Sequence, residues 1–119
     1  MGNYNELKVW NKSVDLAIGV YRATAEFPKD EIFGLRMQMR RAAVSVPCNL
    51  AEGAGRSTSK DYRHFVLQAR GSLLELETQI VISERLEFID AQTATALKNA
   101  TAEIGKMLNG LLRYLTPDA

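Results

Sequence analysis

Apolar residues recur every three or four positions along most of the chain, which is the spacing of helices that bury one face. Proline follows the first and last of these segments, and Gly53 and Gly55 end the second;. No stretch alternates polar and apolar residues between turn signals, so no strand is expected. The pattern predicts an all-α, antiparallel up-down four-helix bundle. A single domain, residues 1–119, would hold helices at about 6–26, 31–53, 59–87 and 90–115.

Each predicted helix has one apolar stripe able to fill a bundle core. Pro47 lies inside the second helix, and because the apolar spacing keeps its phase there, we expect a kinked helix rather than a break;. In the first helix the main stripe is Leu7, Trp10, Val14, Ala17, Ile18, Tyr21 and Ala25. In the third it is Tyr62, Phe65, Val66, Ala69, Leu73, Leu76 and Ile80.

Two of the helices carry a second apolar stripe behind the first. A helix in a four-helix bundle needs only one buried stripe, so a second stripe needs another partner. A homo-oligomer buries such stripes symmetrically, and we therefore expect the protein to bind copies of itself. The expected interface consists of Leu67, Leu74, Val81 and Ile82 in the third helix with Val9, Leu16 and Val20 in the first.

Composition narrows the class of protein. The chain has 119 residues and a single cysteine, Cys48, so no disulfide framework is available within it and a reducing compartment is expected;. No uninterrupted apolar run approaches the roughly 20 residues that span a bilayer, and the first residues lack the pattern of a signal peptide;. We expect a cytoplasmic protein with no membrane partner.

Charge is distributed unevenly although the net charge is only +1. Residues 1–70 contain 11 Lys or Arg and 7 Asp or Glu, whereas residues 71–119 contain 4 and 7. Such asymmetry is typical either of a surface for an anionic partner, such as RNA or another nucleic acid, or of ordinary solvated helix faces that happen to be basic. No aromatic residues interleave with the cations, so contacts would be to the phosphate backbone. The candidate nucleic-acid-binding residues are Arg36, Arg40, Arg56, Lys60, Arg63 and Arg70. The alternative is that these residues build contacts between protein subunits.

The chain has few side chains that could form a nucleophile–base pair, because it contains only one histidine and one cysteine. We predict no enzymatic activity, no catalytic residue, no cofactor and no metal. Cys48 is expected to be a small buried side chain, and His64 a solvent-facing one near Gln68;. The segment 53–60 combines glycines, hydroxyls and cations, and helix capping is favoured there over an anion site;.

The run from Arg40 to Gly53, RRAAVSVPCNLAEG, resembles the signature of a bacterial four-helix bundle family known as 23S rRNA intervening-sequence proteins. Further blocks agree with that family: Leu7 to Trp10, Gly71 to Gln79, and Leu108 to Leu112. The matched signature positions assigned a structural role are Arg41, Pro47, Asn49, Glu52 and Gly53, and we expect Asn49 to satisfy backbone groups that Pro47 leaves free.

The resemblance implies a bundle that assembles as a homopentamer and has no known enzymatic activity. Some relatives are encoded within an intervening sequence of the large ribosomal RNA gene. Others are similar to the accessory variability protein of diversity-generating retroelements, which binds nucleic acid and a reverse transcriptase. Two functions follow as expectations. One is a nucleic-acid-binding oligomer, and the other is a protein-only adaptor for a nucleic-acid enzyme such as a reverse transcriptase.

Overall fold

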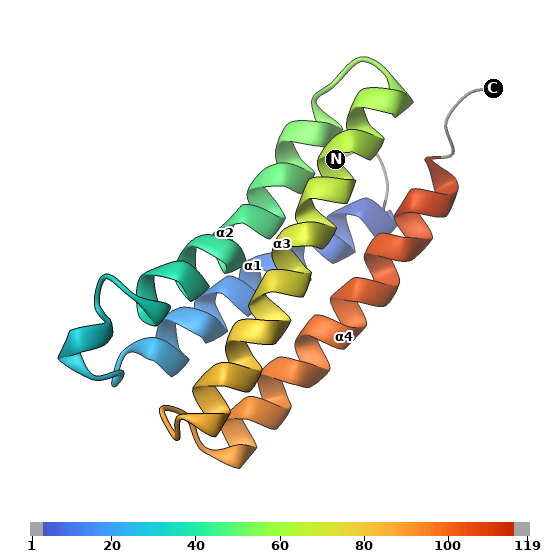
Figure 1. Ribbon diagram of the computed structural model, residues 1–119. Helices are drawn as coiled ribbons and strands as arrows, with labels where there is room; N and C mark the ends of the chain where they lie inside the picture. Colours follow the sequence, from blue (N-terminus) through green and yellow to red (C-terminus); the bar gives the residue numbers. More distant parts are fainter. Residues whose placement is uncertain (1–3, 116–119) are drawn as a thin grey trace.

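Four long helices account for most of residues 4–115, the part of the chain that the computed structural model describes. Each helix packs against two neighbours, so that α1 and α3 both lie between α2 and α4. Successive helices run in opposite directions along the 48 Å axis of the molecule (Figure 1). The all-helical prediction is confirmed, and the described residues contain no strand. The helices are α1 (Tyr4–Thr24), α2 (Leu35–Ala54), α3 (Ser59–Arg85) and α4 (Ala91–Tyr114).

The start of the second helix differs from the sequence prediction by four residues. Lys29–Glu31 form a separate 3-10 turn, η1, and α2 begins only at Leu35, after Gly34. The carboxylate of Glu31 accepts a hydrogen bond from the Leu35 backbone N–H at 2.9 Å. A side chain from the preceding turn therefore satisfies one of the free amides at the helix N-terminus.

Capping explains where α3 and α4 begin. The Thr58 hydroxyl accepts a hydrogen bond from the Asp61 N–H at 3.1 Å, which confirms that hydroxyls before the third helix serve as caps;. The Asp90 carboxylate accepts from the Thr93 N–H at 2.7 Å at the start of α4. That backbone hydrogen bond favours the charged form and lowers the pKa of Asp90 below its usual value;.

The prediction for α1 chose the wrong stripe. Val9, Leu16 and Val20, expected at an oligomer interface, are buried in the core of the single chain. Leu7, Ile18 and Tyr21 of the expected core stripe are instead 44–45% exposed. Two polar residues caused the error, because Ser13 and Thr24 interrupt the inward stripe yet are fully buried. Their hydroxyls donate to the backbone carbonyls of Val9 and Val20, four residues earlier, which makes them compatible with a core;.

In α3 the two stripes are arranged as predicted. Val66, Ala69, Leu73, Leu76 and Ile80 are buried. On the other side of the helix Leu67, Leu74 and Ile82 are exposed, and Val81 is half-buried. Apolar side chains therefore remain at the surface of α3 as well as of α1.

The helices α2 and α3 approach very closely at Gly53. Pro47 lies buried within α2, and the helix continues through it to Ala54. One turn and a half later, a Cβ on Gly53 would lie 2.7 Å from Phe65 Cβ and 2.9 Å from Tyr62 Cδ1. Both distances are shorter than real carbon–carbon contacts. Only glycine fits this position without moving one helix away from the other.

We predict that Gly53→Ala lowers the free energy of unfolding by about 1–3 kcal/mol, because the added methyl group separates the helices. Gly110→Ala is the matched control, since a Cβ there would meet only the Arg113 side chain, at 3.8 Å. Removing a glycine from the interior of α4 should raise stability by about 0.5–1 kcal/mol. Urea denaturation of both variants at one protein concentration provides the measurement. Equal stabilisation by the two substitutions would contradict the close approach.

Candidate interaction surface

Arg40 fastens the end of α1 to α2. Its Nε donates to Thr24 Oγ1 at 2.9 Å and its Nη2 donates to the Tyr21 carbonyl at 3.0 Å. The guanidinium also lies over the Tyr21 ring, with 4.3 Å between Cζ and the ring centroid. A cation at a helix C-terminus is favoured by the helix dipole, and the donated bond satisfies a terminal carbonyl. Arg40, predicted to contact nucleic acid, is thus engaged within the chain.

Three other predicted nucleic-acid contacts also have partners in the same chain. Arg63 Nη1 donates to the Leu112 carbonyl near the end of α4, at 2.6 Å. Arg70 Nη1 donates to Asn109 Oδ1 at 3.3 Å and so joins α3 to α4. Arg56 pairs with Glu52 at 3.0 Å, and its Cζ lies 4.7 Å from the centroid of the Phe65 ring. These arginines stabilise the contacts between helices that the fold requires.

Arg36, Arg41 and Lys60 differ from these four arginines, because no ion pair or side-chain hydrogen bond engages them within residues 4–115. Two of them, Arg36 and Arg41, line a groove of about 700 Å³ along the outer side of α2. Arg40 lies between them, and no carboxylate from the described residues lines the groove. The remaining lining residues are Tyr21, Ile32, Met37, Val44, Ser45 and Cys48. The groove is therefore both cationic and apolar.

Cys48 is exposed in this groove, so the expectation of a buried cysteine is wrong. It lies on the outward side of α2, whereas Val46, Pro47 and Leu50 face the core. His64 is exposed as expected, and its Nε2 lies 3.0 Å from Gln68 Nε2. Cys48 and His64 belong to different helices, and within residues 4–115 neither side chain is hydrogen-bonded to a group that could serve it as a catalytic base or acid.

Asn49 joins a polar chain at the contact between α2 and α3. Its Nδ2 donates to the Ser45 carbonyl at 2.8 Å and to Ser45 Oγ at 2.9 Å, and Ser72 Oγ donates to the same Ser45 Oγ. The carbonyl that Pro47 leaves without its usual helical donor is that of Ala43, four residues earlier. The expectation that Asn49 compensates for Pro47 is therefore wrong, because Asn49 binds Ser45 instead.

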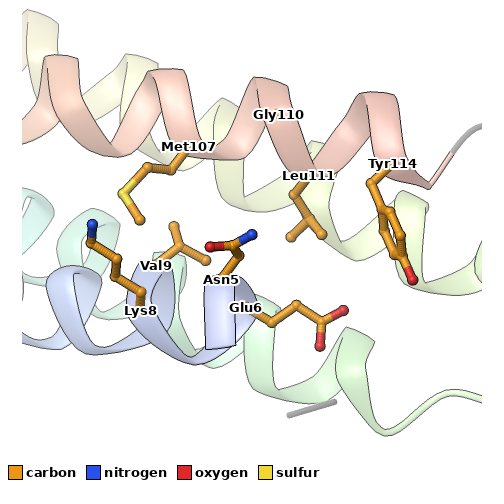
Figure 2. A pocket seen from close by; sticks show the side chains of 8 residues that line it. All are labelled: Asn5, Glu6, Lys8, Val9, Met107, Gly110, Leu111 and Tyr114. Carbon is orange, nitrogen blue, oxygen red and sulfur yellow. The ribbon is translucent and has the colours of Figure 1, made fainter. Parts of the chain in front are cut away.

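A second hollow, with a volume of about 430 Å³, lies between α1 and α4. Figure 2 shows Val9 and Glu6 of α1 facing Met107, Leu111 and Tyr114 of α4 across it. Glu6 is only 6% exposed, although sequence reasoning did not single it out. Glu6 lies three residues before Val9 and therefore on the inward stripe of α1. This spacing could have predicted that Glu6 is buried.

Burial of the nearby Tyr62 side chain raises the pKa of its phenol to about 12. The negative charge of Glu6 acts in the same direction, because it disfavours a second anion;. The Tyr62 phenol is therefore neutral near neutral pH. The hollow is lined by apolar side chains together with the Asn5 amide, the Glu6 carboxylate and the Lys8 ammonium group, and no Ser, Thr, Cys or His of the described residues lines it.

None of the described helices is both long and apolar enough to cross a lipid bilayer. Within residues 4–115, no three His, Cys, Asp or Glu side chains are grouped so that they could hold a metal ion. Neither finding assigns a function. The features of the molecule that bear on its function are its exposed apolar residues and the cationic groove on α2.

The architecture is that of an antiparallel four-helix bundle. Residues 5–110 match the family model of the 23S rRNA-intervening sequence protein, and the chain belongs to this family. It is also similar to a solved structure from Bacteroides thetaiotaomicron, described as a protein of unknown function from the S23 ribosomal protein family. That likeness has a TM-score of 0.85 at 20% identity and covers 92% of this chain and 99% of the other, which establishes a shared fold. No curated protein matches the sequence significantly.

We predict that Arg40→Ala lowers the free energy of unfolding by about 1–3 kcal/mol, because it removes two charge-assisted hydrogen bonds and the contact with Tyr21;. Arg113→Ala is the control, since Arg113 is exposed on α4, and a change within about 0.5 kcal/mol is expected;. Chemical denaturation measures both. An Arg40 variant as stable as the control would show that the arginine is available for an outside partner.

Proposed function

We propose that this protein acts by self-association, as a helical interaction module without catalytic chemistry. The observation that carries the proposal is the outward position of large apolar side chains on several elements of one chain. Leu7, Ile18 and Tyr21 share one side of α1, and Leu67 and Leu74 share one side of α3. Isolated exposed apolar residues are normal on monomers, but stripes of them are typical of protein interfaces.

The protein-only form of this function is better supported than RNA binding. Four of the six predicted phosphate-binding side chains already donate to, or pair with, groups of their own chain. Their use on a phosphate would break contacts between the helices. The remaining two, Arg36 and Lys60, lie at opposite ends of the segment between the start of α2 and the start of α3. A partner protein, including further copies of this chain, suits the surface better.

Sedimentation of the purified protein at micromolar concentration tests self-association. We expect a mass that is a multiple of 13.3 kDa and, if the number of subunits implied by the family resemblance applies, five times that value. The expected assembly buries the stripes of α1 and α3 and should persist in moderate salt, because apolar burial is insensitive to screening. A single species of 13.3 kDa across this range would refute the proposal.

A titration with structured RNA separates the two forms of the function. We expect no salt-sensitive binding of RNA, that is, no affinity that falls steeply between about 50 mM and 200 mM salt. The reason is that too few cations of the protein are available to displace counterions from the RNA. Filter binding at both salt concentrations is the measurement, and a basic RNA-binding protein serves as the positive control. Affinity at low salt that drops by about 10³-fold or more at the higher salt would favour the nucleic-acid-binding form instead.

A further inference from the structure

The cationic and apolar residues that line the groove on α2 indicate what kind of partner it binds. Arg36 and Arg41 line it without a carboxylate partner, and its apolar lining includes Ile32 and Val44. The whole of α2 contains one acidic residue, Glu52, which is paired with Arg56 outside the groove. A helix that combines exposed apolar side chains with glutamates would bury the apolar lining and neutralise the arginines.

The same chain carries such a helix surface in the C-terminal half of α3. Leu74 and Ile82 are exposed there, at 55% and 42%, and Leu86, the residue that follows the helix, is 53% exposed. The segment 74–87 contains four glutamates and a single arginine, and one of the four, Glu84, is paired with Lys98 of α4. The other three are available to a cationic partner. At 1.5 Å per residue, positions 74–86 span about 18 Å, and positions 36–48 along the groove span the same length. The two surfaces match in length, polarity and charge.

These surfaces cannot meet within one molecule. The inner side of α3 already packs on α2, where Ser72 Oγ donates to Ser45 Oγ at 2.9 Å and Ser83 Oγ contacts Met39 Sδ at 3.1 Å. Leu74 points away from that contact, since it lies two residues from Ser72 along the helix, and Ile82 and Leu86 are exposed rather than packed on α2;. An occupant with this chemistry therefore has to come from a second copy of the chain.

We infer that the cationic groove on α2 of one copy binds the exposed stripe Leu74–Leu86 of α3 on another copy. This inference rests on the proposed self-association and names the two surfaces that produce it. The outward side chains Ile18 and Leu7 of α1 lie on the same helix face as Tyr21 and extend the apolar part of the groove;. They add contact area to an interface that the groove alone would leave small.

Two variants test the pairing by sedimentation. The groove variant carries Arg36→Glu and Arg41→Glu, and the stripe variant carries Leu74→Lys and Ile82→Lys. Each removes one of the two complementary surfaces, and each is expected to sediment at 13.3 kDa with a dissociation constant raised about 100-fold or more;. An equimolar mixture is expected to form a species with one copy of each, because the intact groove of one variant meets the intact stripe of the other.

The control variant reverses two exposed cations on α4, Lys106→Glu and Arg113→Glu, and should keep the mass of the unchanged protein. Circular dichroism and a thermal melt show whether each variant is folded. If the unchanged protein assembles but either variant keeps its mass, or if the folded variants do not associate when mixed, the pairing is wrong and self-association stands. If the unchanged protein is a monomer, self-association and the pairing are both wrong.

Discussion

The contact between α2 and α3 at Gly53 is the constraint on which the other features depend. The two helices are so close there that a single methyl group does not fit. This approach, together with the hydrogen bonds among Ser45, Asn49 and Ser72, fixes the rotation of α2 about its own axis. Because of that rotation Arg40 reaches the end of α1, while Arg41 and Cys48 line the outer groove. The groove is thus a consequence of how the core packs.

The arginines that define the basic half of the chain divide into two groups with different physical roles. Arg40 and Arg63 each bind a backbone carbonyl near the end of a neighbouring helix, where terminal carbonyls lack helical donors;. Arg36 and Arg41 have no such contact, and they line a groove together with apolar residues. A count of positive charges does not distinguish these groups, since it does not reveal which guanidiniums are already satisfied. The fold therefore reduces the cations available to an anionic partner.

The proposed function follows from this division. The family model covers most of the chain, and the likeness to a solved bundle at 20% identity establishes the fold, but neither names an activity. Apolar stripes on α1 and α3 remain at the surface, and the unpartnered arginines lie beside one of them. A chain with an apolar, cationic groove on one helix and an apolar, acidic stripe on another has the components of self-association.

Periodicity and side chains that are near in the chain were enough to predict the four helices, most of their ends, the core stripe of α3 and the capping role of Thr58. The prediction for α1 was wrong, because the polar residues Ser13 and Thr24 interrupt the stripe that faces the core and make it look the weaker of the two. The packing of the four helices selects the inward stripe, since Ser13 and Thr24 donate their hydroxyls to carbonyls of their own helix and become core residues. The partners of Arg63 and Arg70 lie 49 and 39 residues away on α4, and contacts over such distances leave no periodic signal.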